Sequence, residues 1–147
     1  MSEVTSLPQV HPIVGTRPEL DETTHMYPHF RHDRERGLKV GKNDLEKSYE
    51  NGDFLRVVLL SVCLCEDLVR FCSLRYTSIH EGSLWTLTKD LQRKGDLNHS
   101  LTEDLRILWK YRTRLTHYFQ YNPSLVSKKK SQWCRDVFQR TWNRLGG

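Results

Sequence analysis

The chain has 147 residues, of which 37% are hydrophobic and 28% are charged, and its formal net charge is +5. This length can bury a hydrophobic core without disulfides or a structural metal, and the composition is that of an ordinary soluble protein. The longest apolar run, residues 57–65, is too short to cross a bilayer and no secretory signal precedes it, so we expect a cytoplasmic protein without a membrane partner.

The first 40 residues differ in composition from the rest of the chain. Residues 1–40 hold four of the five prolines and show no sustained periodicity, which predicts an extended or partly disordered arm. His25, His29 and His32 would share one face of a helix, as metal ligands can. Pro28 interrupts that spacing and argues against a helix there, so we favour a surface arm over a metal site.

From residue 41 onward, apolar residues recur at helical spacing, and no stretch alternates as a strand would. The expected helices are a short one closed by Gly52, a long buried one over residues 53–76, one from the cap Ser83 to the stop Gly95, one over residues 100–121 that opens with a capping box of Ser100 and Glu103, and one after Pro123. The sequence therefore predicts an all-α, up-and-down bundle of four to five helices over residues 41–147.

Three of the four cysteines lie in the second expected helix. On a helix Cys65 and Cys72 share a face with valines, Cys63 points elsewhere, and Cys134 lies far along the chain. Neither a CxxC spacing nor a matching histidine pair accompanies them, so a zinc or redox site is not favoured. We interpret the cysteines as packing residues.

Basic residues are concentrated in the last quarter of the chain. Residues 110–147 hold nine lysines and arginines against one acidic residue, Asp136. Such a bias suits a polyanionic partner. It includes the triplet Lys128, Lys129 and Lys130, which on its own is more typical of a solvated helix start.

The fourth expected helix carries a charge on its apolar stripe. The stripe follows steps of three and four residues through Leu101, Leu105, Leu108, Arg112, Leu115 and Phe119. The guanidinium of Arg112 stays charged and is costly to bury without a partner. That partner is either a bound phosphate or a carboxylate of the second helix, Glu66 or Asp67. In the second case Arg112 stabilises the bundle, and His117 is a cation near the helix end, where the macrodipole favours one.

The stretch RTRLTH, from Arg112 to His117, is an arginine, four residues and a histidine near the end of the fourth helix of a small bundle. It resembles the signature of the HEPN (higher eukaryotes and prokaryotes nucleotide-binding) family, and CEDLVR in the second helix resembles the Glu-x-x-x-Arg of the family's facing helix. The resemblance covers about residues 41–145. Two positions depart from it: Thr113 stands where the family often has asparagine, and Phe119 where one toxin subgroup carries a tyrosine that is adenylylated.

The resemblance implies a metal-independent endoribonuclease, without a cofactor, that acts as a toxin or antiviral defence effector beside a separate antitoxin or sensor chain. The residues marked for this function are Arg112 and His117 as catalytic, Thr113, Glu66 and Arg70 as supporting, and Lys110, Arg114, Lys128, Lys129 and Lys130 as RNA-binding. The alternative is a catalytically silent HEPN-like module that binds RNA, a nucleotide or an acidic protein partner.

Helix geometry bears on how the arginine and the histidine would work together. Five residues turn an α-helix by about 500°, so Arg112 and His117 of one chain lie about 140° apart around the axis. One chain is therefore poorly placed to grip a single phosphate with both side chains. A homodimer with a composite cleft, which the family resemblance also implies, would bring two such pairs together. Trp109, Thr113 and His117 follow one another at steps of four and are either a lining for that cleft or, for Trp109, part of the core.

Overall fold

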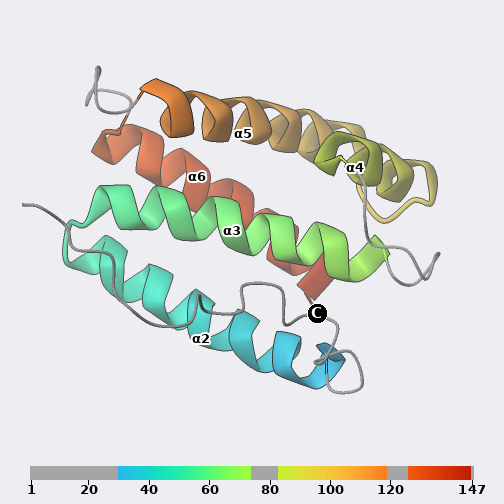
Figure 1. Cartoon of the computed structure of the whole chain (residues 1–147), viewed down its shortest axis with the longest axis horizontal. Coiled ribbons are helices and arrows are strands. Elements are labelled where there is room, and N and C mark those ends of the chain that lie inside the picture. The colour runs from blue at the N-terminus through green and yellow to red at the C-terminus, as the bar shows by residue number, and fades with distance from the viewer. Residues whose placement is uncertain (1–29, 74–82, 119–125, 147) are drawn as a thin grey trace, which may run out of the picture.

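The computed structural model describes residues 30–73, 83–118 and 126–146. Within these ranges every element is a helix: α2 (Phe30–Glu50), α3 (Phe54–Ser73), α4 (Leu84–Arg93), α5 (His99–Tyr118), α6 (Lys128–Thr141) and the short π-helix η5 (Trp142–Gly146). Figure 1 shows that α2 runs antiparallel to α3, and α5 antiparallel to α6. The predicted all-α bundle is confirmed.

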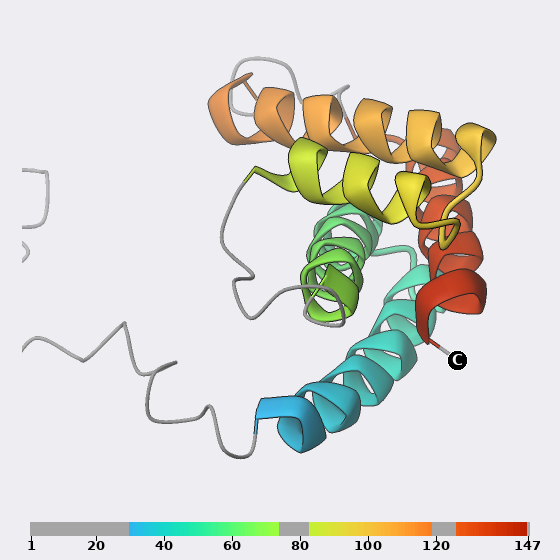
Figure 2. The same cartoon turned by 90° about the vertical axis from the view of Figure 1, so that its right-hand side faces the viewer.

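Helix α3 lies at the centre of the bundle. It packs against α2, α4, α5, α6 and η5, and Figure 2 looks nearly along it. Its middle is apolar on most sides and mostly buried, and an exposed stripe runs along one side through Arg56, Leu59 and Cys63. Cys65 and Cys72 are fully buried in it, Cys134 of α6 is buried as well, and Cys63 is exposed. All four are free thiols, and the three buried ones pack in the core as predicted.

Two glycines end helices in the left-handed conformation that side chains disfavour. Gly52 has φ 75° and Gly95 has φ 85°. After α4, the amide of Asp96 donates to the carbonyl of Leu91 at 2.9 Å and the amide of Gly95 donates to that of Gln92 at 3.0 Å. This is a Schellman motif, and it satisfies carbonyls that the helix end leaves without partners. Both glycine stops were predicted.

The helix starts agree with the sequence analysis at some positions and differ at others. Ser83 caps α4 as expected, with its hydroxyl accepting from the amide of Thr86 at 3.1 Å. The predicted capping box at Ser100 is wrong, because α5 begins at His99 and the side chain of Asn98 accepts from the amide of Leu101 at 2.8 Å.

Helix α2 begins earlier than residue 41, where the sequence analysis placed it. It begins at Phe30, so residues 30–40, which the prediction assigned to the arm, continue the first helix. Pro28, His25 and His29 lie outside the described residues, as do residues 1–29 of the arm generally.

The longest apolar segments of the described ranges are core helices. None of the helices over residues 30–73, 83–118 and 126–146 is long and apolar enough to span a membrane.

Candidate functional site

Arg112 is not buried in the apolar stripe on which it falls. Leu108 is fully buried and Leu115 is 8% exposed, yet the side chain of Arg112 between them is 49% exposed. The stripe predicts a covered position at Arg112, whereas over the described residues its side chain is only about half covered. Phe119, the last member of the stripe, lies outside the described residues.

The guanidinium of Arg112 faces a carboxylate of the central helix. Its Nη2 lies 3.5 Å from Oε1 of Glu66, whose side chain is 24% exposed. The other carboxylate oxygen of Glu66 accepts from Nε of Arg70 at 3.2 Å. Three residues that the sequence analysis assigned to the site, Arg112, Glu66 and Arg70, are thus brought together on the side of α5 that faces α3. One carboxylate thus bridges two arginines.

Cys63 lies at the edge of the same cluster. Burial raises the pKa of its thiol, and the charges of Glu66 and Asp67 raise it further, while Arg112 opposes that shift. The thiol is therefore protonated at neutral pH and is a poor nucleophile.

His117 and Thr113 are both exposed on α5, but the third residue of their row is not. The hydroxyl of Thr113 donates to the backbone carbonyl of Trp109 at 3.2 Å, which fixes it against its own helix. Trp109 is buried and its indole N–H donates to the hydroxyl of Thr88 in α4 at 3.2 Å. Trp109 therefore belongs to the core and does not line a cleft, and only Thr113 and His117 of the row are exposed.

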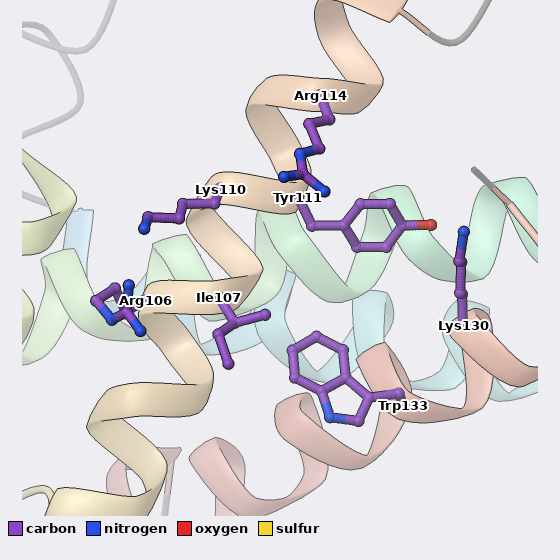
Figure 3. Close-up of a pocket in the computed structure, with 7 residues that line it drawn as sticks. All are labelled: Arg106, Ile107, Lys110, Tyr111, Arg114, Lys130 and Trp133. Carbon is purple, nitrogen blue, oxygen red and sulfur yellow. The ribbon is translucent and has the colours of Figure 1, made fainter. Parts of the chain in front are cut away.

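A groove lies between α5 and α6 on the other side of α5 (Figure 3). It encloses about 370 Å³ and is lined by Arg106, Ile107, Lys110, Tyr111, Arg114, Lys130 and Trp133. We call it the α5–α6 groove. Tyr111 extends from α5 toward α6 with its hydroxyl on the side of Lys130, and the indole of Trp133 lies beside Ile107. The groove thus combines four basic side chains with two aromatic rings.

The basic residues predicted to bind RNA divide between the groove and the open surface. Lys110, Arg114 and Lys130 line the groove. Lys128 and Lys129 are exposed in the first turn of α6 and are not among the residues that line it. The cap residue of that turn is Ser127, whose hydroxyl accepts from the amide of Lys130 at 3.2 Å.

The sequence analysis missed the aromatic part of the groove. Ile107 and Tyr111 are spaced by four residues at the border between the apolar and polar faces of α5, and Trp133 has the same position on α6. This spacing could have indicated half-buried side chains on each helix, but it does not reveal that the two helices place these side chains next to each other. Burial raises the pKa of Tyr111 to about 12, so its phenol stays protonated and uncharged.

His117 and Arg112 point in different directions from α5. Lys110 and His117 are seven residues apart, which turns the helix by about 700°, so both lie within about 20° of one direction. Arg112 lies about 140° away from His117 and faces α3. Within one chain, therefore, the histidine belongs to the outward basic face and the arginine to the α3 side.

Comparison with known proteins adds no relative. No protein-family model, no curated protein and no solved structure matches this chain. The site is therefore interpreted from its own residues.

Proposed function

We propose that this protein is a metal-independent endoribonuclease that cleaves RNA at Arg112 and His117 as a homodimer, with a role as a toxin or antiviral defence effector. The observation that carries the proposal is the half-exposed guanidinium of Arg112, which Glu66 of α3 holds. Arg112 lies on α5, the helix that also presents His117 and one side of a basic groove. An arginine held in place yet open to solvent is suited to bind a phosphodiester.

The chemistry needs few protein groups, because RNA carries its own nucleophile. The 2′-hydroxyl gives up its proton to one imidazole, and its oxygen forms a bond to phosphorus while the bond from phosphorus to the 5′-oxygen breaks. A second imidazole donates a proton to the departing 5′-oxygen. Arg112 donates N–H groups to the non-bridging oxygens as they gain charge. The products are a 2′,3′-cyclic phosphate and a 5′-hydroxyl.

The need for two imidazoles and the angle between the two side chains favour a dimer. A twofold axis near the exposed end of α5 would place His117 of each protomer on opposite sides of one phosphate, with both Arg112 guanidinium groups beside it. Each protomer then supplies one of the two imidazoles, because α5 of one chain carries a single His117.

Cleavage of labelled single-stranded RNA in excess EDTA tests the proposal. We expect the wild type to release fragments with cyclic phosphate ends and His117→Ala to lose at least about a hundredfold in rate, since a general acid–base group contributes about 10² to 10⁴. His99→Ala is the matched control, because His99 is an exposed histidine at the opposite end of α5. Thermal unfolding of both variants checks that they are folded. Equal rates for the wild type and His117→Ala would contradict the proposal.

A catalytically silent RNA-binding module is the second candidate. The ion pair between Arg112 and Glu66 favours it, because a guanidinium paired within its own chain also has a structural use. This candidate predicts binding of RNA that depends on the α5–α6 groove and no cleavage by the wild type under any condition of the same assay.

A further inference from the structure

We propose that the α5–α6 groove binds unpaired nucleotides of a single RNA strand, with a base stacked on the aromatic residues and the backbone phosphates on the lysines and arginine around them. The groove is separate from Arg112 and lies on another side of α5. The proposal rests on the proposed function only in taking RNA as the ligand, and it holds whether or not the RNA is cut.

The apolar part of the groove has the chemistry of a stacking platform. Tyr111 and Trp133 are half-buried, so their rings are held by the core while part of each lines the groove. Ile107 beside them is 46% exposed and adds aliphatic surface to the platform. An aromatic platform accepts any base, because every base has a π face.

The charged part of the groove is complementary to phosphate. Over the ranges that the structure describes, no carboxylate lies within ion-pair distance of Lys110 or Arg114. Arg106 differs, because its Nε donates to Glu103 of the same helix at 2.8 Å. Lys130 closes the groove on the α6 side, beyond the hydroxyl of Tyr111 (Figure 3). The groove therefore offers cations on both sides of its rings.

The shape of the groove limits what fits in it. Its volume of about 370 Å³ is near the lower end of the range for small-molecule sites, about 300 to 1,000 Å³. That space suits a base with its sugar. In duplex RNA the base faces are already stacked and cannot reach the rings. Single-stranded RNA is therefore the occupant that uses both the rings and the cations.

The position of the groove relative to His117 would let the groove direct a bound strand toward the histidine. Lys110 and His117 point the same way from α5 and are about 10 Å apart along its axis. A strand held in the groove would thus continue along α5 toward His117. The groove would then fix which phosphate of the strand reaches the histidine.

Binding of a labelled 2′-O-methyl oligonucleotide tests the inference. This RNA lacks the nucleophilic hydroxyl and cannot be cleaved by the proposed reaction, so binding is measured apart from cleavage. We expect Trp133→Leu to weaken binding by about 5- to 100-fold and Trp133→Phe to retain most of it, because stacking contributes about that much per base. Trp85→Leu is the matched control, since Trp85 is 37% exposed on α4 with Lys89 over its ring.

A charge variant keeps the test valid if Trp133→Leu folds poorly in thermal unfolding. Lys110→Ala should lower the slope of log affinity against log salt by about 0.7, as expected for one lost phosphate contact on a single strand. Lys39→Ala, an exposed lysine of α2, should leave the slope unchanged. Equal effects of the groove and control variants would overturn the inference.

An acidic peptide is the other possible ligand of a basic groove, and competition separates the two. Polyglutamate of the same charge has no bases to stack and should displace the oligonucleotide only at much higher concentration. Displacement at equal concentration would overturn the inference. Loss of binding in Trp133→Leu together with no cleavage by the wild type would refute the ribonuclease but support the groove. Cleavage that depends on His117, with binding unchanged in Trp133→Leu and Lys110→Ala, would do the reverse.

Discussion

At the scale of single residues, Glu66 joins the two arginines of the candidate site. Its two oxygens face Arg112 and Arg70 at 3.5 and 3.2 Å. The Arg112 side chain is half exposed, so the pair adds little to stability, about 0 to 1 kcal/mol. We therefore expect Glu66 to matter more for orienting Arg112 toward a phosphate than for the stability of the fold. It would be a positioning residue, which acts through the guanidinium and does not touch the substrate.

Glu66→Gln tests this role, because it keeps the shape of the side chain and removes its charge. We expect kcat for RNA cleavage to fall by about tenfold or more with KM little changed, since a misplaced donor costs mainly the transition state. The midpoint of urea unfolding should hardly move. Asp44→Asn is the control, as Asp44 pairs with Arg56 between α2 and α3, away from Arg112. A loss of stability without a fall in kcat would assign Glu66 a structural role.

The buried thiol of Cys134 predicts how stability depends on alkaline pH. Burial raises its pKa to about 12 from an ordinary value of 9.0. Above pH 9 the unfolded chain therefore loses this proton while the folded chain keeps it, so the free energy of unfolding falls with rising pH until about pH 12. The slope approaches about 1.4 kcal/mol per pH unit for one such group. Urea unfolding under reducing conditions between pH 9 and 11 should show a shallower fall in Cys134→Ser than in the wild type, and equal slopes would contradict this prediction.

The position of Arg112 shows what residue periodicity can and cannot reveal. The period correctly placed Leu101, Leu105, Leu108 and Leu115 in the core. It gives the direction of a side chain from the helix axis, but whether that direction is covered depends on the neighbouring helices. Nothing in the sequence of α5 encodes that cover, so the half-exposed guanidinium could not be foreseen. Its pairing with Glu66 could, because a charge on that side of α5 needs an opposite charge on the facing helix.

At the scale of helices, the stops were easier to predict than the starts. Gly52 and Gly95 could be foreseen because few residues other than glycine adopt a positive φ readily. The start of α5 could not, because Asn98 and Ser100 are both good cap residues and only the path of the preceding turn decides between them. The early start of α2 was missed because the prolines before it suggested an irregular segment.

The cap of α5 can be tested by two alanine variants. Asn98→Ala removes the side-chain acceptor for the amide of Leu101 and should lower the free energy of unfolding by about 1 kcal/mol. Ser100→Ala is the matched comparison, since Ser100 lies inside the first turn and is exposed, and it should change stability by less than about 0.5 kcal/mol. Urea unfolding gives both values. The opposite order would restore Ser100 as the cap.

At the scale of the whole molecule, the α5–α6 groove depends on two helices that residues 119–127 separate in the chain. The basic bias of residues 110–147 predicted a polyanionic partner, but composition alone does not distinguish Lys128, Lys129 and Lys130 from one another. Packing of α6 against α5 separates them, because Lys130 lines the groove and the other two lie on the open surface. Sequence composition can therefore predict the sign of the partner's charge, whereas the binding surface itself requires the tertiary structure.

The composite site makes a prediction that concerns two chains at once. Arg112→Ala and His117→Ala homodimers should each be nearly inactive, the first without a guanidinium and the second without an imidazole at the shared phosphate. A heterodimer of the two keeps one Arg112 and one His117, on opposite protomers. Because only one of the two imidazoles is present, we expect mixing after partial unfolding and refolding to raise cleavage above that of either variant alone but to leave it at least about a hundredfold below the wild type, with light scattering to confirm a dimeric mass.

Refolding each variant alone is the control for this mixture, because it repeats the treatment without forming heterodimers. If each chain held a complete site, every chain in the mixture would still lack one of the two groups, and no activity would return. A monomeric mass for the wild type would exclude the shared site as well. Arg112 and His117 of one chain lie about 140° apart around α5. Complementation thus tests whether the arginine of one protomer acts together with the histidine of the other.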